Sequence, residues 1–489
     1  MKRFVHIWCY LLPLVLSLAL LPSCKDSIVS DDPTLRLTLS RDTLSFDTGF
    51  TGIGSATEQI MIRNYNKNAI RISKIWIEDG RYFHVNIDGE TEFDKLQGFE
   101  LRGGDSLYVF VQVNIDPSDQ DNPFLIQDAV HIAYNDHVQD LTLMAHGQDV
   151  VLVRSKERLS QFETLSLTAE RPYLVYDTVL VSGALTMEAG TRVYMHSGAS
   201  IYAYGDVQIN GTLTLPVTVQ GDRLDNLFDS VPYSYAAGAW GGIYLVNSKK
   251  AELPTYHINY AEIRGGNVGL YCISERSKQL PSLVLHNSVI HNHALYGLVL
   301  ENINAEVVNT EISNTASYCV YINGGTQRFV HTTIASYFRW TNVNIQSTYR
   351  DSVSAVYIDN LSKTGPQTRT SFINSVITGV GRNNLRLATP LAQYYGGEFI
   401  GCYIKADSLI TASAHDNVYW HSTDTANVFV NDFYEYKKWQ YYDFRLDSLS
   451  PARGIAIPDT ATNYPLDRLG YNRLEDSHAD AGCYEYVQP

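Results

Sequence analysis

Residues 287–334 repeat one four-residue phrase three times: Asn287-Ser288-Val289-Ile290, Asn309-Thr310-Glu311-Ile312 and His331-Thr332-Thr333-Ile334. The closing isoleucines are 22 residues apart in both steps, and related phrases end at Ile263, Ile377 and Ile404, after steps of 27, 43 and 27 residues. A second apolar position follows each phrase, at Leu270, Leu298, Val320, Val356 and Leu385. Two registers with periods in the low twenties predict a solenoid with two strands per coil and a loop insertion around 337–351.

The repeat also predicts which side chains point inward. Equivalent residues of stacked coils form columns about 4.8 Å apart. Each isoleucine and the residue two places before it point inward, and the residues on either side of the isoleucine point outward. Asn287, Asn309 and Asn374 share the place three before the isoleucine. This pattern resembles the asparagine ladder of right-handed parallel β-helix proteins of the pectate-lyase-like superfamily, in which side-chain amides satisfy turn backbone groups.

A different pattern precedes the repeat. Residues 35–150 read as about seven short alternating strands separated by polar turns, which indicates a β-sandwich. The phrases Ser45-Phe46-Asp47-Thr48, Val85-Asn86-Ile87-Asp88-Gly89 and Ala145-His146-Gly147 resemble the immunoglobulin-like domains that precede other domains in bacterial envelope proteins. The chain is therefore predicted to be all-β: an immunoglobulin-like β-sandwich (35–150), then a right-handed parallel β-helix (165–440).

The last segment, 441–489, is predicted to be a C-terminal cap. It carries Ser450-Pro451-Ala452, an Asp467-to-Arg473 phrase and a closing Asp480-x-Gly482-x-x-Glu485. This resembles the tail of many bacterial β-helix proteins. We expect it to cover the open end of the solenoid, where unpaired strand edges would otherwise be exposed. Asp467, Arg473, Asp480 and Glu485 are predicted to be structural partners within this cap.

The N-terminus predicts export and lipid anchoring. Met1-Lys2-Arg3 is followed by an apolar run and by Leu21-Pro22-Ser23-Cys24, which has the form of a signal peptide (1–23) and resembles a bacterial lipobox. Cys24 is the predicted lipidation site, and 24–34 is a tether. Lys25-Asp26-Ser27 resembles the export signal of surface lipoproteins of Bacteroidetes, so we expect an outer membrane lipoprotein facing the cell surface. The alternative is an unlipidated signal peptide that leaves a free cysteine.

Composition excludes some partners. A net charge of −15 argues against nucleic acid, because phosphate contacts need clustered Lys and Arg. The cysteines lack C-x-x-C spacing, and neither a metal site nor a cofactor is predicted. The 34 tyrosines suit long β-sheets with aromatic outer faces, and would also suit sugar binding. The expected partners are a membrane, through the lipid, and a polysaccharide or an envelope protein.

Polar residues concentrate at outward places on three successive coils. These residues are Glu262, Arg264, His291 and Glu311. Two strand spacings would put Glu262 and Glu311 about 10 Å apart. One hypothesis is that Arg264 holds a carboxylated sugar while His291 moves a proton. The alternative, which the sequence favours, is an exposed ladder of screened charges that contributes little.

Signatures of known β-helix enzymes are missing from the coils. There is no Asp-Asp pair, no Gly-His-Gly phrase and no run of aspartates for calcium. The first functional expectation is therefore a non-enzymatic surface protein that binds a glycan or another envelope protein. The second is a carbohydrate-active enzyme, a polysaccharide lyase or glycoside hydrolase, acting on an acidic polysaccharide.

Overall fold

The structure is a computed structural model in which the chain forms two compact units that divide between Gln148 and Asp149. It describes residues 28–55, 57–92, 97–116, 124–154, 159–228, 231–248, 252–276, 278–338, 354–359, 368–388, 397–406, 414–416, 418–421, 427–431, 442–475 and 478–488. The predicted lipidation site, Cys24, lies outside these residues. Within them, no helix has the length and apolar character needed to cross a membrane.

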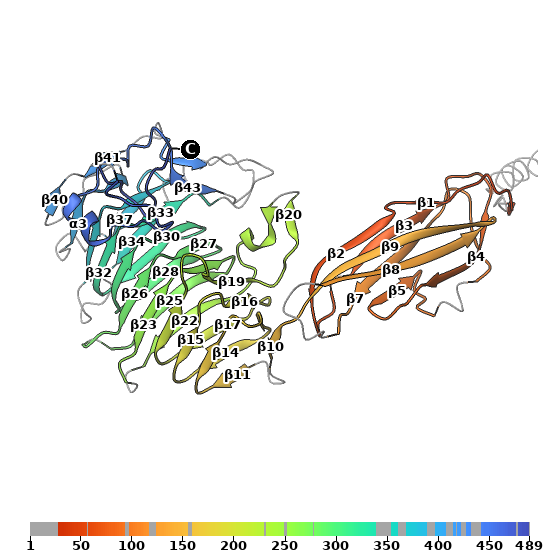
Figure 1. Ribbon diagram of the computed structural model, residues 1–489, viewed down its shortest axis with the longest axis horizontal. Helices are drawn as coiled ribbons and strands as arrows, with labels where there is room; N and C mark the ends of the chain where they lie inside the picture. The colour runs from red at the N-terminus through yellow and green to blue at the C-terminus, as the bar shows by residue number, and fades with distance from the viewer. Residues whose placement is uncertain are drawn as a thin grey trace, which may run out of the picture. The chain divides into compact units, whose positions relative to one another are not determined.

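The first unit is a sandwich of two sheets, and it fits an immunoglobulin-like domain (Figure 1). One sheet contains β1 (Thr38–Leu39), β3 (Glu58–Arg63), β7 (Ser106–Val113) and β5 (Phe83–Ile87). The other contains β2 (Thr43–Phe50), β9 (His137–Gln148), β8 (Phe124–Tyr134), β4 (Ile70–Ile77) and β6 (Phe99–Leu101). Its strand pairs are antiparallel, except that β2 and β9 run parallel. Alternating residues of each strand face a shared apolar core, because successive side chains of a strand point to opposite faces.

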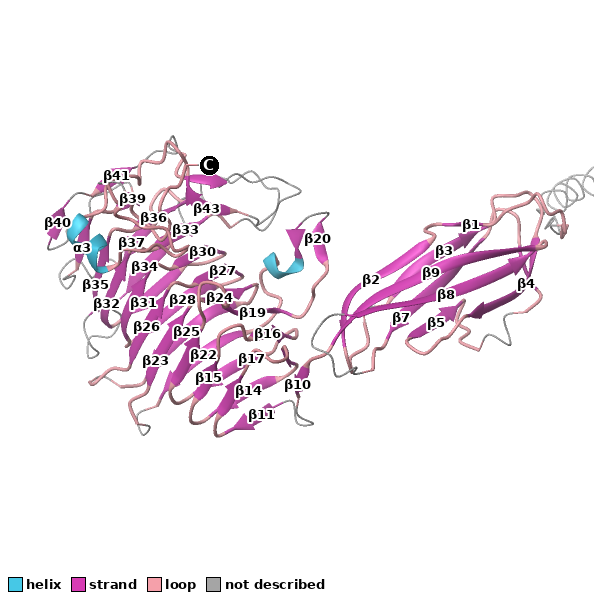
Figure 2. Cartoon of the chain, in the orientation of Figure 1, coloured by secondary structure: helices cyan, strands magenta, loops and turns pink. Residues whose placement is uncertain are grey.

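The second unit is a parallel β-helix built from three sheets (Figures 1 and 2). Sheet 1 contains β10 (Val151–Val153), β13 (Tyr173–Val175), β16 (Arg192–Met195), β19 (Val217–Gly221), β24 (Ala261–Arg264), β27 (Val289–His293), β30 (Glu311–Thr315), β33 (Thr333–Ser336), β36 (Val376–Gly379), β39 (Tyr403–Lys405) and β41 (Tyr419–His421). Sheet 2 contains β11 (Leu159–Phe162), β14 (Thr178–Val181), β17 (Ser200–Ala203), β22 (Gly242–Asn247), β25 (Val268–Ser274), β28 (Tyr296–Glu301), β31 (Val320–Asn323), β34 (Val356–Asp359) and β37 (Leu385–Leu387).

Sheet 3 and a few short elements complete the second unit. Sheet 3 contains β12 (Leu165–Leu167), β15 (Leu185–Met187), β18 (Val207–Asn210), β23 (Thr255–Asn259), β26 (Ser282–His286), β29 (Asn304–Val308), β32 (Gly325–Val330), β35 (Thr368–Ile373), β38 (Glu398–Ile400) and β40 (Ala414–Asp416). The short elements are β20 (Asn226–Phe228), β21 (Val231–Pro232), η2 (Tyr233–Tyr235), β42 (Phe429–Asn431), β43 (Asp443–Leu446) and α3 (Pro458–Asn463).

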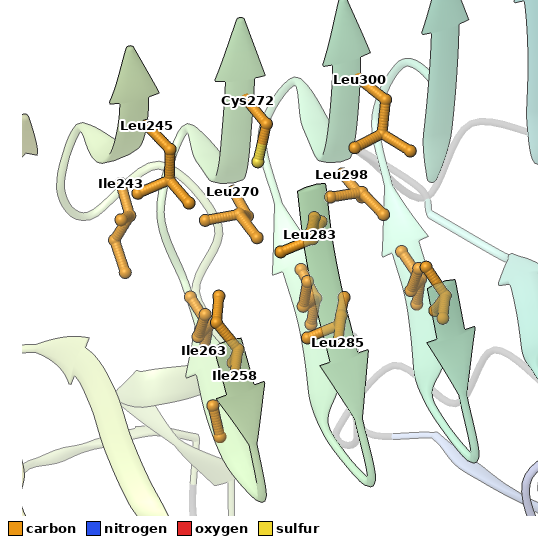
Figure 3. Close-up of a cluster of buried hydrophobic side chains, with 14 of the residues drawn as sticks. Ile243, Leu245, Ile258, Ile263, Leu270, Cys272, Leu283, Leu285, Leu298 and Leu300 are labelled. Atoms are coloured by element: carbon orange, nitrogen blue, oxygen red, sulfur yellow. The ribbon is translucent and has the colours of Figure 1, made fainter. Parts of the chain in front are cut away.

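Both predicted registers are confirmed as columns of the core. Isoleucines of successive coils pair from Ile263 to Ile404 in sheet 1 and are fully buried. The second register runs from Leu270 to Leu385 in sheet 2, and Figure 3 shows its members Leu270 and Leu298 beside each other. Ile334 pairs directly with Ile377, so the 43-residue step is one coil with an insertion.

The prediction of two strands per coil is wrong, because each complete coil has three. The missed strand belongs to sheet 3, where Ile258, Leu285, Val307, Phe329, Phe372 and Phe399 form the inward column. Sheet 3 mixes leucine, valine and phenylalanine, and polar residues separate its apolar positions. Each coil therefore shows the ordinary alternation of a half-buried strand, without one repeated letter to mark it.

Asparagines line the turn between sheet 3 and sheet 1. The amide of Asn287 donates to Asn259 (2.9 Å), and the amide of Asn309 donates to Asn287 (3.2 Å). Asn374 bonds instead to His331 Nε2 (3.1 Å) and to the backbone of Ile457. Asn287, Asn309, His331 and Asn374 all have φ near +50°, a left-handed conformation that asparagine tolerates better than most residues.

The C-terminal tail lies on the flank of the β-helix, whereas the sequence predicted that it would cover the open end. Residues of the tail and of the outer face of sheet 1 share one apolar cluster: Ala335, Val376, Tyr403, Val428, Phe429, Tyr442, Phe444, Leu446, Ala452, Ala481, Cys483 and Tyr484. The amide of Gly482 donates to the Asn374 carbonyl (2.8 Å), and that of Cys483 to Thr333 Oγ1 (3.0 Å). Burial of this face explains why its outward positions are apolar on several strands.

The four residues predicted for the cap meet in one hydrogen-bonded group. The Arg473 guanidinium is fully buried and donates to Glu485 Oε2 (3.2 Å) and to Asn309 Oδ1 (3.0 Å). The Asp467 carboxylate accepts from three backbone amides, and that of Asp480 accepts from two. Arg473 therefore ties the tail to the asparagine turn of the β-helix.

Candidate functional site

The four residues singled out in the sequence lie on neighbouring strands of sheet 1. Glu262 pairs with Val289, which pairs with Glu311, so the two glutamates share a column two strands apart. Arg264 pairs with His291, which pairs with Ser313 in the neighbouring outer column. The repeat thus places these side chains on the outer face, as the register predicts.

The expectation that these charges form an exposed ladder is wrong, because the tail covers part of this face. His291 is 3% exposed and Glu311 is 6% exposed. The phenol of Tyr484 and the aromatic ring of Phe444 lie against them from the tail. Glu262 and Arg264 are half-buried at the edge of the covered region. Electrostatic interactions here are consequently stronger than at a solvated surface.

A cleft of about 350 Å³ lies between the tail and sheet 1. Its lining includes Arg264, His291 and Glu311 from the β-helix. Glu262 does not line the cleft, but it pairs with Arg264 and Arg468, which do. The complete lining is Tyr235, Arg264, Val289, His291, Glu311, Tyr442, Asp443, Phe444, Arg445, Arg468, Leu469 and Tyr484. This size falls at the lower end of the range for small-molecule sites.

A buried chain of polar groups holds one side of the His291 ring. Nδ1 of His291 lies 2.6 Å from Ser313 Oγ and 3.3 Å from Glu311 Oε1. The Ser313 hydroxyl donates to Glu311 Oε1 (2.5 Å), and the Tyr484 hydroxyl donates to Glu311 Oε2 (2.6 Å). Because Ser313 donates its one proton to Glu311, Nδ1 carries the hydrogen that it shares with Ser313. In the neutral ring, Nε2 is then the basic nitrogen.

The Glu311 carboxylate is ionised in this setting. Burial alone would raise its pKa, but hydrogen bonds and charge from His291, Ser313 and Tyr484 outweigh burial and lower the pKa to about 2. Burial also raises the pKa of the Tyr484 phenol well above its usual range. Tyr484 is therefore a protonated donor to a charged acceptor.

Two arginines frame the cleft and share one carboxylate. The guanidinium of Arg468 bonds to Glu262 Oε1 (2.8 Å), and that of Arg264 to Glu262 Oε2 (3.2 Å). A third arginine, Arg445, is exposed and pairs with Asp443. Among the described residues, Nε of Arg264, Nε of Arg468 and Nε2 of His291 are buried atoms that have no hydrogen-bond partner. Such atoms are uncommon, and here three residues that carry one line the same cleft.

His293 faces away from this cleft. Its ring is fully buried, and Nε2 lies 3.2 Å from the carbonyl oxygen of Ile263. Burial lowers the pKa of His293 to about 3, so the imidazole is neutral at physiological pH. The two histidines therefore lie in separate environments, and His291 is the one that lines the cleft. Within the described part of the chain, no group of three or more His, Cys, Asp or Glu side chains is placed to hold a metal ion.

Sequence reasoning missed the residues that the tail contributes. Phe444, Arg445, Arg468 and Tyr484 follow His291 by more than 150 positions, and no spacing connects them with the repeat. Ser313 was within reach, because it occupies the place in its coil that His291 and Arg264 occupy in theirs.

Comparisons with known proteins show distant likeness only. No family model matches the chain, and no curated protein matches it. A protein of unknown function from Porphyromonas gingivalis W83 is 17% identical over 26% of this chain, with a TM-score of 0.18, and the chain spans about half (51%) of its length.

Two longer matches are similarly weak. The catalytic unit of a GH87 α-1,3-glucanase from Streptomyces thermodiastaticus is 10% identical over 75% of this chain and 84% of its own, with a TM-score of 0.26. Dex49A from Penicillium minioluteum is 11% identical over 83% of this chain and 77% of its own, with a TM-score of 0.15. At these TM-scores the likenesses carry no argument about this protein.

Proposed function

We propose that this protein is an outer membrane lipoprotein that binds a carboxylated glycan in the cleft between sheet 1 and the tail. One observation carries the proposal: the side chains of Arg264, Arg468 and His291 line the cleft, and each has a buried nitrogen that no described protein group satisfies. A buried donor or acceptor without a partner costs about 1–3 kcal/mol. A ligand whose oxygens accept from the two arginines, and whose hydroxyl donates to Nε2 of His291, would recover that free energy.

The chemistry of the lining favours a carboxylate on a sugar. A guanidinium binds carboxylates through parallel N–H donors, and two arginines flank the cleft. The rings of Tyr235 and Phe444 contact His291 edge-on, at centroid distances of 5.6 and 5.9 Å, and give the cleft apolar walls. Aromatic walls with a few convergent polar groups are typical of sites for small ligands. A uronate unit of a polysaccharide combines the carboxylate with the apolar ring face that such a site accepts.

A second candidate function, a polysaccharide lyase, is favoured by the way His291 is held. Ser313 and Glu311 fix Nδ1, which leaves Nε2 as the basic nitrogen of a side chain that lines the cleft. A general base in a lyase needs this orientation, with a cation such as Arg264 beside the substrate carboxylate. A glycoside hydrolase is less favoured, because the Glu311 carboxylate is tied to Ser313 and Tyr484 instead of facing the cleft.

Binding and product analysis together test both candidates. Isothermal titration with oligogalacturonate is expected to show binding by the wild-type protein and at least tenfold weaker binding by Arg264→Gln, because an arginine–carboxylate contact contributes about 1.5–3 kcal/mol. Arg71→Gln is a matched control, since Arg71 also pairs with a glutamate (3.0 Å) but lies on the sandwich. Equal affinity of wild type and Arg264→Gln, or no binding of any acidic oligosaccharide, would contradict the proposal.

The same samples separate the two candidates. Binding without new chain ends supports a binding protein. Unsaturated products that disappear in His291→Ala, while affinity for the oligosaccharide is kept, support a lyase.

The anchor is tested separately. Cys24→Ser is expected to abolish incorporation of radiolabelled palmitate and to move the protein from the detergent phase to the aqueous phase, since several acyl chains are needed for stable anchoring. Protease treatment of intact cells then tests the surface location, and protection of the wild-type protein would contradict it.

A further inference from the structure

The outer face of sheet 2 carries a row of tyrosines along successive coils. Tyr202 of β17 pairs with Tyr244 of β22, which pairs with Tyr271 of β25. Farther along the same outer column, Tyr321 of β31 pairs with Tyr357 of β34. All five side chains are half-buried. The coil repeat therefore places these phenol rings in a row that runs along the axis of the β-helix.

One coil within the row lacks a tyrosine in the column, and the ring contacts form one group on each side of it. That place is held by Val299, which is buried. Tyr296 lies beside it, with its ring 6.2 Å from that of Tyr321 and 6.3 Å from that of Tyr318. The other neighbouring rings are 4.5 Å (Tyr202 and Tyr244), 5.7 Å (Tyr244 and Tyr271), 4.9 Å (Tyr318 and Tyr357) and 6.0 Å (Tyr321 and Tyr357) apart. These contacts hold the rings in place before any ligand arrives.

The polar groups of the row are neutral donors beside carboxylates. Burial raises the pKa of Tyr244, Tyr271, Tyr318 and Tyr321, so their hydroxyls keep their protons. The Tyr271 hydroxyl donates to Glu301, and that of Tyr321 donates to Asp359 Oδ2 (3.4 Å). The row thus offers donors and acceptors side by side, with two acidic side chains among them.

We propose that this tyrosine row is a second binding surface, and that it takes an uncharged, hydroxyl-rich polysaccharide lying along the axis of the β-helix. An extended polymer fits because tyrosines occupy the same column on five of six successive coils, whose strands are about 4.8 Å apart. Sugar hydroxyls both donate and accept, which matches a row of phenols and carboxylates. Glu301 and Asp359 lie within the row and repel a polyanion, whereas the cation Arg386 follows Tyr357 at the end of the column, so an uncharged glycan suits the row better than the acidic glycan proposed for the cleft.

Preformed stacking adds to the case. Rigid aromatic side chains lose little conformational entropy when a ligand binds, because their rotamers are already fixed. The row lies on sheet 2 and the cleft on sheet 1, and they share no residue. Evidence against ligand binding at one surface is therefore not evidence against binding at the other.

Affinity electrophoresis in gels that contain soluble neutral glucans or mannans, with polygalacturonate as the charged comparison, tests this surface. We expect at least one neutral polysaccharide to retard the wild-type protein, and the double variant Tyr244→Ala with Tyr271→Ala to bind it at least tenfold more weakly. The double variant Tyr244→Phe with Tyr271→Phe keeps the stacked rings and removes two hydroxyls, so it should bind with intermediate affinity. Both double variants should melt close to the wild-type temperature, which would exclude a folding defect as the cause of weaker binding.

Two controls locate the effect. Tyr108→Ala removes a tyrosine that is 44% exposed and stacks on Phe110 (6.1 Å) in the sandwich. His291→Ala alters the cleft, and both controls should bind the neutral polysaccharide as wild type does. The proposal is overturned if no neutral polysaccharide retards the wild type, if the double alanine variant binds unchanged, or if the row variants lose polygalacturonate binding instead.

Discussion

The substitution Glu311→Gln tests how strongly the buried carboxylate holds the tail against sheet 1. The amide keeps the shape of the side chain but removes the charge that His291, Ser313 and Tyr484 stabilise. Those interactions lower the pKa of Glu311 from 4.5 to about 2. At about 1.4 kcal/mol for each tenfold change, the shift corresponds to about 3 kcal/mol. Hydrogen bonds to a charged group, at about 1.5–3 kcal/mol each, give the same order.

The pH dependence follows from the sign of the shift. A carboxyl group whose folded pKa lies below its unfolded value stabilises the folded state fully above pH 4.5, and this stabilisation is lost as pH falls toward 2. Wild type and Glu311→Gln should therefore differ by about 3 kcal/mol at neutral pH and converge in acid. The wild-type tail should lose protection over that interval, and the variant should change less.

Hydrogen exchange measured by mass spectrometry reads out local opening of the tail. The amides of Gly482 and Cys483 are suitable probes, since both donate across the contact with sheet 1. Glu306→Gln is the matched control, because Glu306 lies on the β-helix and bonds to His286 (3.2 Å) but is 40% exposed. A protection difference of under 0.5 kcal/mol for Glu311→Gln at neutral pH, or one that does not change with pH, would refute the reasoning.

Three further substitutions test the architecture. Gly482→Ala places a Cβ on a residue whose φ is +101°, so it should destabilise docking of the tail by about 1–3 kcal/mol and speed proteolysis of the tail. The control Gly454→Ala has more space around the new Cβ and should have a smaller effect. Asn287→Gly removes two ladder hydrogen bonds while keeping the left-handed turn, so chemical unfolding should show a loss of about 1–2 kcal/mol and a larger loss for Asn287→Ala. Ile312→Ala should cost about 2–5 kcal/mol in the same assay, and the exposed Leu295→Ala under 1.

The inward columns could be read from the sequence because each coil repeats the same packing problem. Ile290, Ile312 and Ile334 fill equivalent places between the same neighbours, so one residue type recurs at a fixed step. The column of sheet 3 changes from leucine to phenylalanine along the axis, and a varied column leaves no repeated letter. A period is therefore visible only where packing demands one side-chain shape.

Only the part of the cleft that the β-helix contributes could be predicted from the sequence. The register placed His291 and Glu311 on one outer face, but the expected setting of both was solvated. What buries them is Tyr484, 173 residues beyond Glu311 and outside the repeat. No local pattern encodes such a contact, because it depends on where the tail returns to the β-helix. The fold class followed from local periodicity, while the environment of the site followed from one long-range docking.

The cleft forms only when the tail is docked on sheet 1. Seven of the twelve lining residues come from the tail; Arg473 and Gly482 fix the tail to the asparagine turn, and Cys483 fixes it to β33. A substitution that loosens the tail therefore weakens ligand binding even when no ligand contact is lost. Gly482→Ala and Arg264→Gln separate the two effects, since the first should reduce both amide protection and binding, and the second binding alone. A ligand seated in the cleft should in turn slow amide exchange in the tail, because whatever binds the docked state stabilises it.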